Sequence, residues 1–295
     1  MIEIKDVKSI EIVPYTLMTS SISAVLALIY ALLFIIIISI TSIYVPGLSA
    51  SLIVTLAIAM ILMFPTAGFL ISIIQSFLTA LLYNLLVPWL GAIKLGFEDM
   101  NEIKNVPVVP LALMASALGG IIIFLIMLIV GPIIAVSLQV AASSAGAAIP
   151  GLSSFPALGI VGILIMVIGV PIVMFISIFI ATAIMAIIYN LLAPKIGGIK
   201  FNFGSAVENL FEIESIPVVP FAIITTVVIT LFGLITQVIS FIAAVAMGQS
   251  ITTQLISLVT SVLTDLVFGF IIYALTAFLY NYFRPKIGGI KLQIE

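Results

Sequence analysis

The residues best suited to chemistry in this chain are one isolated carboxylate and three Tyr-Asn pairs. Asp265 is the only charged residue that lies within a long apolar stretch. A charge in a membrane span is costly and therefore a functional candidate, so Asp265 is a candidate cation or proton site. The alternative is an interfacial residue in contact with water, because a helix from Asp265 to Arg284 would measure about 28 Å. That length places the carboxylate near the outer interface.

The three Tyr-Asn pairs recur in similar surroundings and are the second candidate group. They are Tyr83-Asn84, Tyr189-Asn190 and Tyr280-Asn281. Three phenol and amide groups around one axis could form polar rings that select an ion. The alternative is structural: Asn ends each helix and Tyr anchors it at the membrane interface. We prefer the structural interpretation because it explains both residue types without a pore.

Several kinds of catalysis are excluded by composition. The 295 residues include no His and no Cys, which removes imidazole bases, thiolate nucleophiles and zinc sites built on either residue. The apolar stretches offer one carboxylate where an intramembrane aspartyl protease needs two. The sequence therefore predicts no enzymatic activity, no metal site and no cofactor. A net charge of −2 also argues against nucleic acid as a partner.

The elements that position these residues are predicted from hydropathy. The chain is 64% hydrophobic and 7% charged, which is typical of an integral membrane protein. The long apolar stretches are residues 15–87, 111–193 and 221–283, and each is interrupted by Gly, Pro or Ser near its middle, at 45–49, 142–154 and 248–250. Each stretch can hold two spans of about 20 residues. We therefore expect six transmembrane helices in a mainly α fold.

The charged blocks between these stretches predict the orientation. They are residues 1–14, 88–110, 194–220 and 284–295, and together they contain all nine basic residues. An even number of spans separates successive blocks, so all four face one compartment. The positive-inside rule predicts that this compartment is the cytoplasm, with both termini in it. The expected location is the plasma membrane of a prokaryotic cell.

One unit is repeated three times along the chain. Each Tyr-Asn pair is followed by Pro at the same spacing, namely Pro88, Pro194 and Pro285, and then by Gly-Gly-Ile-Lys or, in the first copy, Gly-Ala-Ile-Lys. A second motif ends at Pro14, Pro110 and Pro220. The copies run from 1 to 98, 99 to 207 and 208 to 295 and form one membrane domain. We predict a pseudo-threefold arrangement of three two-helix repeats.

Short strands are expected at the ends of each copy. Residues 199–203 and 290–295 alternate between apolar and polar side chains after the Gly-Gly pair, and residues 1–5 alternate likewise. Each Pro should stop its helix. We expect the strands to form a small cytoplasmic sheet that caps the helices. Pairing of residues 2–5 with residues 290–295 would close a ring.

Two prolines predict irregular helices. Pro65 and Pro171 lie at the same distance before the repeated Tyr, so both are candidate helix kinks. The third copy has Val262 at this position. There, residues 251–264 form an amphipathic helix without charge, which suits the outer interface or the wall of a wet cavity.

The repeated tail resembles a known group of proteins. Tyr-Asn, Pro, Gly-Gly-Ile-Lys and an alternating strand resemble the tails of small archaeal membrane proteins of unknown function and of an actinobacterial two-span transmembrane domain. The resemblance covers about a dozen residues of each copy, and Trp89 and Ala92 in the first copy depart from it. It implies a two-span unit, here triplicated, and carries no activity.

Three functions fit these features. The first is a non-enzymatic scaffold or accessory subunit, with the lipid bilayer and other membrane subunits or a second copy as partners. The alternative is a channel or carrier for an ion or small solute, which uses the pseudo-threefold axis or a cavity near the broken helices. The third is a protein that interacts with lipid. A dry axis would favour the scaffold, and a continuous polar path would favour transport.

Overall fold

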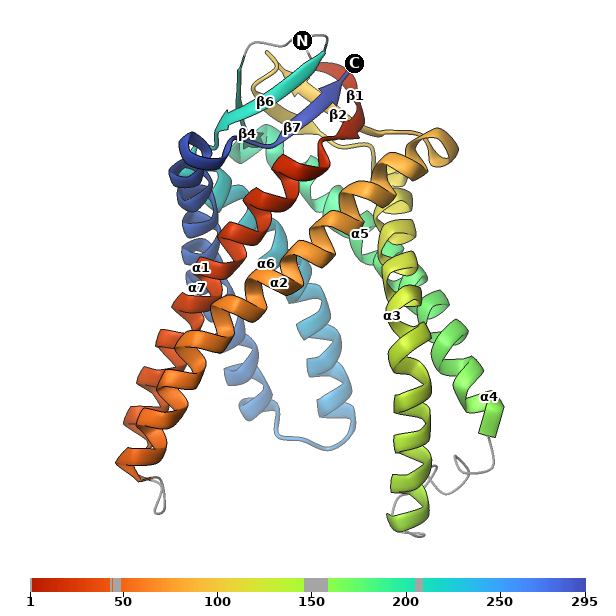
Figure 1. Ribbon diagram of the computed structural model, residues 1–295, viewed down its shortest axis with the longest axis vertical. Helices are drawn as coiled ribbons and strands as arrows, with labels where there is room; N and C mark the ends of the chain where they lie inside the picture. Colours follow the sequence, from red (N-terminus) through yellow and green to blue (C-terminus); the bar gives the residue numbers. More distant parts are fainter. Residues whose placement is uncertain (1, 43, 45–48, 146–158, 205–208) are drawn as a thin grey trace.

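The protein is mainly helical, with a small set of strands at one end (Figure 1). The computed structural model describes residues 2–42, 44, 49–145, 159–204 and 209–295. Within these residues, six helical segments are long and apolar enough to cross a membrane, as expected. The helices are α1 (Ile12–Thr41), α2 (Ala50–Leu90), α3 (Val108–Ala145), α4 (Gly159–Leu164), the π-helical turn η3 (Ile165–Gly169), α5 (Val170–Ile196), α6 (Val218–Ala246) and α7 (Ile251–Ile287). The fourth span consists of α4, η3 and α5 in succession.

Consecutive helices form three hairpins, which are α1 with α2, α3 with α4 to α5, and α6 with α7. The third hairpin turns at residues 247–250, as expected from Gly248, Gln249 and Ser250. Of the loops expected at 45–49 and 142–154, residues 45–48 and 146–154 lie outside the described residues. Ser49 is the N-cap of α2, and residues 142–145 belong to α3, so the second loop was expected to begin too early. Small residues allow close helix contact inside the hairpins, since a Cβ on Gly68 would lie 2.8 Å from the Cβ of Ala27.

The second helix of each hairpin ends at glycine rather than at proline. We expected the helices to stop at Pro88, Pro194 and Pro285, but each continues for two further residues. A proline near the end of a helix removes one backbone hydrogen bond without preventing another half turn. The helices end where the next residue has a positive φ, which is 85° at Gly91, 92° at Gly197 and 83° at Gly288. Glycine adopts this conformation without strain.

The two candidate kinks lie in different backbone environments. Helix α2 is continuous through Pro65. Pro171 comes directly after η3, where the chain makes one turn of π-helix before α5. Residues 251–264, expected to be an amphipathic helix, form the first part of α7.

Seven short strands at one end of the helices form a continuous ladder. They are β1 (Ile2–Ile10), β2 (Ile93–Glu98), β3 (Glu102–Asn105), β4 (Ile199–Lys200), β5 (Asn202–Phe203), β6 (Leu210–Ser215) and β7 (Lys291–Ile294), in the order β4-β3-β2-β1-β7-β6-β5 with every pair antiparallel. Only Phe201 separates β4 from β5. One segment of chain therefore pairs with β3 at its start and with β6 at its end, so the strand pairings return to their starting point.

The first and last strands are neighbours, but the expected register was partly wrong. Residues 7–10 of β1 pair with β7, and the backbones of Asp6 and Glu295 exchange hydrogen bonds of 2.7 and 3.0 Å. Residues 2–7 pair instead with β2. Strand β1 is long enough to serve both neighbours, with a register shift between Val7 and Ser9. Both ends of the chain lie at the strand end of the molecule (Figure 1).

Apolar side chains fill the space between strands that are not neighbours. The ring of Phe203 in β5 lies 6.0 Å from that of Phe97 in β2 and 5.9 Å from that of Phe211 in β6. Strands β2 and β5 share no backbone pairing, so their side chains meet inside the ring of strands. Phe97 is 2% exposed. These three aromatic rings therefore pack together inside the ring of strands.

The three hairpins diverge away from the strands (Figure 1). Most fully buried helix residues lie in the strand-proximal halves, including Met18, Met114, Ile224 and Tyr280. The opposite halves carry many exposed apolar side chains, such as Ile36, Ile129 and Ile239. The common core thus lies directly beneath the strands, and beyond it each helix packs mainly against its own hairpin partner.

Candidate functional site

The three Asn side chains bind the backbone where each incoming strand meets its first helix. Asn190 accepts a hydrogen bond from the N–H of Val106 at 2.7 Å and donates one to the carbonyl of the same residue at 2.8 Å. Asn281 makes the same two bonds to Ile216, both at 2.8 Å. Asn84 makes them to Ile10, both at 2.9 Å. Each side-chain amide thus provides hydrogen-bond partners for the backbone N–H and carbonyl of one residue, as a neighbouring strand would.

The three Tyr hydroxyls bridge the incoming and outgoing strands of one repeat. Tyr280 donates to the carbonyl of Ile213 at 2.6 Å and accepts from the N–H of Ile290 at 3.0 Å. Tyr189 makes the equivalent bonds to Ile103 at 2.5 Å and Ile199 at 2.8 Å. In the first repeat the bonds join Tyr83 to Val7 and to Ile93. Each hydroxyl therefore closes a gap in the backbone pairing.

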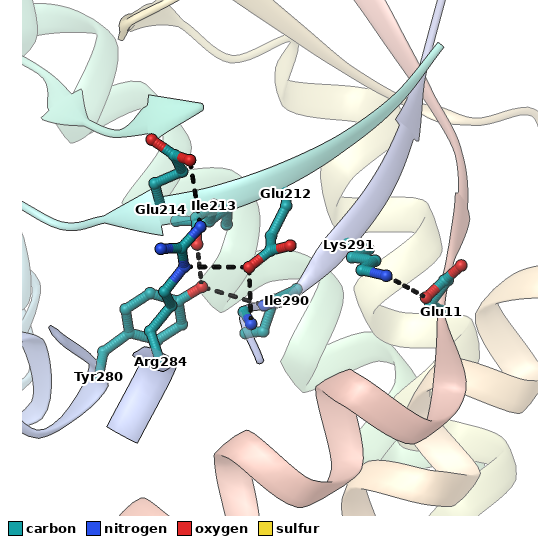
Figure 2. A network of polar contacts seen from close by, with 9 residues as sticks. Glu11, Glu212, Ile213, Glu214, Tyr280, Arg284, Ile290 and Lys291 are labelled. Atoms are coloured by element: carbon teal, nitrogen blue, oxygen red, sulfur yellow. Dashed lines mark hydrogen bonds and ion pairs between the residues drawn. The ribbon is translucent and has the colours of Figure 1, made fainter. Parts of the chain in front are cut away.

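Acidic side chains complete the link in the second and third repeats. Arg284 donates to Glu212 at 3.0 Å and to Glu214 at 3.1 Å (Figure 2). The N–H of Gly289 donates to Glu212 at 3.0 Å. In the second repeat the N–H of Gly198 donates to Glu102 at 2.5 Å. These carboxylates fix the turn that follows each helix.

Glu102 is the most strongly paired of these acids. Its carboxylate lies 2.7 Å from the ammonium of Lys104 and 3.5 Å from that of Lys200. Burial alone would raise its pKa, but hydrogen bonds from Lys104 and Gly198 and the two positive charges together lower it. The bond to Glu102 in turn raises the pKa of Lys104.

Asp265 lies apart from the Tyr-Asn pairs, in the membrane-spanning part of the third hairpin. It is half-buried in α7 and accepts a hydrogen bond from the side-chain amide of Gln237 in α6 at 2.9 Å. Gly233 lies beside this pair, since a Cβ there would be in ordinary contact with the Asp265 carboxylate at 3.5 Å. The structure thus brings Asp265 together with Gln237 and does not bring it to any Tyr-Asn pair.

The positions that match Asp265 and Gln237 hold apolar residues in the other repeats. Gln237 lies 17 residues after Pro220, and Ala31 and Met127 lie at that spacing after Pro14 and Pro110. Asp265 lies 15 residues before Tyr280, where the first two repeats have Gly68 and Met174. Sequence analysis did not identify Gln237 as a candidate. Its spacing from Pro220 was the signal that could have paired it with Asp265.

Two pockets border this pair. One of about 310 Å³ lies between α6 and α7 and is lined by Asp265 together with Thr226, Thr230, Thr264, Tyr273 and apolar residues. The other, of about 140 Å³, is lined by Gln237 and mainly by Ser, Thr and Gln side chains nearer the hairpin turn. The second hairpin has a pocket beside Pro171, and its lining is wholly apolar. Of these three pockets, the two in the third hairpin are the ones with polar lining.

Among the described residues, no group of three or more acidic side chains lies close enough to hold a metal ion. Comparison of the chain with protein-family models, curated proteins and solved structures gave no match. The site must therefore be interpreted from its own geometry.

Proposed function

We propose that this protein is a non-enzymatic membrane scaffold made of three two-helix repeats around a pseudo-threefold axis. The strand ring would lie in the cytoplasm with both termini, because the basic residues gather at that end. The three hairpins would then enter the plasma membrane at fixed spacing and bind another membrane subunit or a second copy of this chain.

The observation that carries this proposal is the packed interior of the strand ring. The rings of Phe97, Phe203 and Phe211 pack against one another where an axial pore would run. A ring of so few strands is also too narrow for a channel, since even about eight strands leave only enough room for side chains. The recurrence of the same Tyr and Asn bonds in all three repeats supports the pseudo-threefold arrangement.

The diverging hairpins suggest where a partner would bind. Their outer halves expose apolar side chains that lipid or another protein must cover in the membrane, among them Ile36 at 54%, Ile129 at 73% and Ile239 at 62% exposure. A rigid cap that holds three such surfaces apart suits a scaffold, since their positions are set before a partner arrives.

Cysteine cross-linking tests this role directly because the chain has no native Cys. Single variants Ile36→Cys, Ile129→Cys and Ile239→Cys would carry a photoactivated cross-linker in native membranes. A scaffold predicts one discrete protein adduct shared by the three positions. Ala112→Cys, at a fully buried position, is the matched control and should give none. Adducts with lipid alone would contradict the scaffold and favour a lipid-interacting protein.

The second candidate is a carrier that uses the third hairpin. The Asp265–Gln237 pair and the two polar-lined pockets favour it. Its test is flux of small ions and amines into liposomes. Flux that Asp265→Asn abolishes would support the carrier, and absence of flux would support the scaffold.

A further inference from the structure

The pocket beside Asp265 contains a carboxylate whose negative charge has no basic side chain, among the residues that the structure describes, to balance it. Within the described spans the carboxylate has the Gln237 amide as its hydrogen-bond partner, and no basic residue lies in the α6–α7 hairpin before Arg284. Arg284 itself bonds Glu212 and Glu214 at the strand end. A carboxylate within an apolar span is costly unless a positive charge or a proton balances it.

Two further groups beside this carboxylate lack partners. The Thr226 hydroxyl lines the same pocket, has no hydrogen-bond partner, and belongs to a residue that is only 4% exposed. The side-chain oxygen of Gln237 is also buried without a partner. Buried polar groups are normally bonded, so the unpartnered Thr226 hydroxyl in this pocket indicates a missing ligand, and the Gln237 oxygen is a second such group at the border of the neighbouring pocket.

Equivalent positions in the other repeats show that the hydroxyl need not be unpartnered. Ser20 and Ser116 lie six residues after Pro14 and Pro110, as Thr226 does after Pro220. Ser20 donates to the carbonyl of Thr16 at 2.6 Å, and Ser116 to that of Leu113 at 3.0 Å. The hydroxyls at this position in the first two repeats are therefore hydrogen-bonded, whereas the Thr226 hydroxyl in the third repeat is not.

These groups define the chemistry of the ligand. The Asp265 carboxylate and the Gln237 oxygen only accept hydrogen bonds, and the Thr226 hydroxyl can also accept one. Thr226 contacts the helix near Gly269, one turn beyond Asp265. The acceptors are therefore spread along the pocket. A metal ion requires oxygen ligands gathered around one point, so this arrangement does not suit a metal ion. The remaining walls include the rings of Phe232, Phe268 and Tyr273.

We propose that this pocket binds a small organic cation, a protonated primary amine with a compact apolar body. The ammonium donates to Asp265, and the body packs against the aromatic rings, which also attract a cation. The volume of about 310 Å³ is at the lower end of the range for small-molecule sites. This proposal does not depend on the scaffold role. A scaffold can bind such a ligand, and a carrier must bind its substrate.

Binding can be measured on the full-length protein in lipid nanodiscs by ligand-observed NMR. The probe is 2-phenylethylammonium, with 2-phenylethanol as its neutral isostere and sodium chloride as the metal-ion probe. Asp265→Asn keeps the shape of the pocket and should weaken amine binding at least tenfold. Ser257→Ala, in the neighbouring pocket only, is the matched control and should leave it unchanged.

Gly233→Ala provides a second variant that keeps the charge. Its new Cβ would lie in ordinary contact with the Asp265 carboxylate and narrow the pocket, so amine binding should weaken at least threefold. Equal binding by the wild type and Asp265→Asn would overturn the proposal. So would equal binding of the neutral alcohol, or competition by sodium ions at the concentration of the amine. None of these results bears on the cross-linking test of the scaffold.

Discussion

At the scale of single residues, the Tyr-Asn pairs show how two side chains can replace part of a β-ladder. Each Asn bonds both the N–H and the carbonyl of one backbone residue, and each Tyr joins two strands. A side chain held by two backbone bonds is in a defined position, and the backbone groups depend on it in turn. Such bonds have measurable consequences for stability.

Replacing Asn281 should destabilise the third repeat. Asn281→Ala leaves the N–H and carbonyl of Ile216 without their partner, and each lost bond costs about 1 kcal/mol or more when the group stays buried. Asn281→Asp keeps the acceptor but loses the donor, so its loss should be intermediate. Thermal unfolding in detergent measures both. Equal stability of the three proteins would show that water replaces the amide.

Glu102 should make stability depend on pH. Its pKa is lower in the folded protein than its ordinary value of 4.5, so its contribution is present above about pH 4.5 and is lost as the pH falls through the folded pKa. Glu102→Gln should therefore cost about 1 kcal/mol at pH 7 and almost nothing at pH 3.

The comparison uses thermal unfolding of the wild type and Glu102→Gln at both pH values, which cancels the titration of other carboxylates. Glu3→Gln is the control, because Glu3 is a far more exposed acid whose ion pair with Lys5 is long, at 3.9 Å. A difference between wild type and Glu102→Gln that stays constant with pH would contradict the assignment.

At the scale of elements, the turn from helix to outgoing strand depends on how closely the backbones approach. A Cβ on Gly198 would lie 1.9 Å from the carbonyl oxygen of Ile103, and one on Gly289 would lie 2.4 Å from that of Ile213. Neither position can accept a side chain without displacing a strand. The first repeat has Ala92 at the same position, where it is buried.

Gly198→Ala should therefore be severely destabilising, by roughly 3 kcal/mol or more, since the clash is with backbone and cannot be relieved by a rotamer change. Ala92→Gly, the reverse change at the matched position, should cost about 1 kcal/mol or less. Thermal unfolding of the two variants measures the contrast. Similar losses in both would show that the two turns tolerate a Cβ equally.

Hydropathy and the positions of Gly, Pro and Ser predicted the helices and strands well. They predicted the ends of these elements less well. The six spans and the short strands follow from long apolar runs and alternation, which are local properties of the sequence. The helix ends at Gly91, Gly197 and Gly288 were missed because a proline near a helix end does not by itself end the helix. The division of β1 between two neighbours depends on distant strands that no local pattern specifies.

The candidate site was predicted only in part, for the same reason. Asp265 was found because a lone charge is visible in any sequence. Its partner Gln237 lies 28 residues away on another helix, and the contact depends on how α6 and α7 pack. The Tyr-Asn pairs were found by repetition, but their contacts with the strand backbone required the tertiary structure.

At the scale of the whole molecule, the cycle of strand pairings predicts that the chain can be cut and rejoined. A circular permutant could begin at Asn101, end at Met100, and join Glu295 to Ile2 through a flexible linker. The order of repeats would become second, third, first, and every hairpin would remain intact. Because β1 and β7 are already neighbours, the permutant should fold with a melting temperature within about 10 °C of the parent.

A permutant opened inside a repeat is the matched control. New ends at Ser250 and Ile251 would separate α6 from α7, so this protein should be less stable or fail to accumulate in the membrane. Comparable yields and melting temperatures for both permutants would contradict the division into three repeats.

The pairing of β1 with β7 also has a consequence for biosynthesis. Strand β1 precedes all six spans in the chain and β7 follows them, so the ribosome makes the six spans before it makes the partner of residues 6–10. Until then only residues 6 and 7 of this segment have a strand partner, which is β2, and the core beneath lacks Leu292 and Ile294. A chain without β7 therefore carries an open strand edge, which can pair with the strand of another chain.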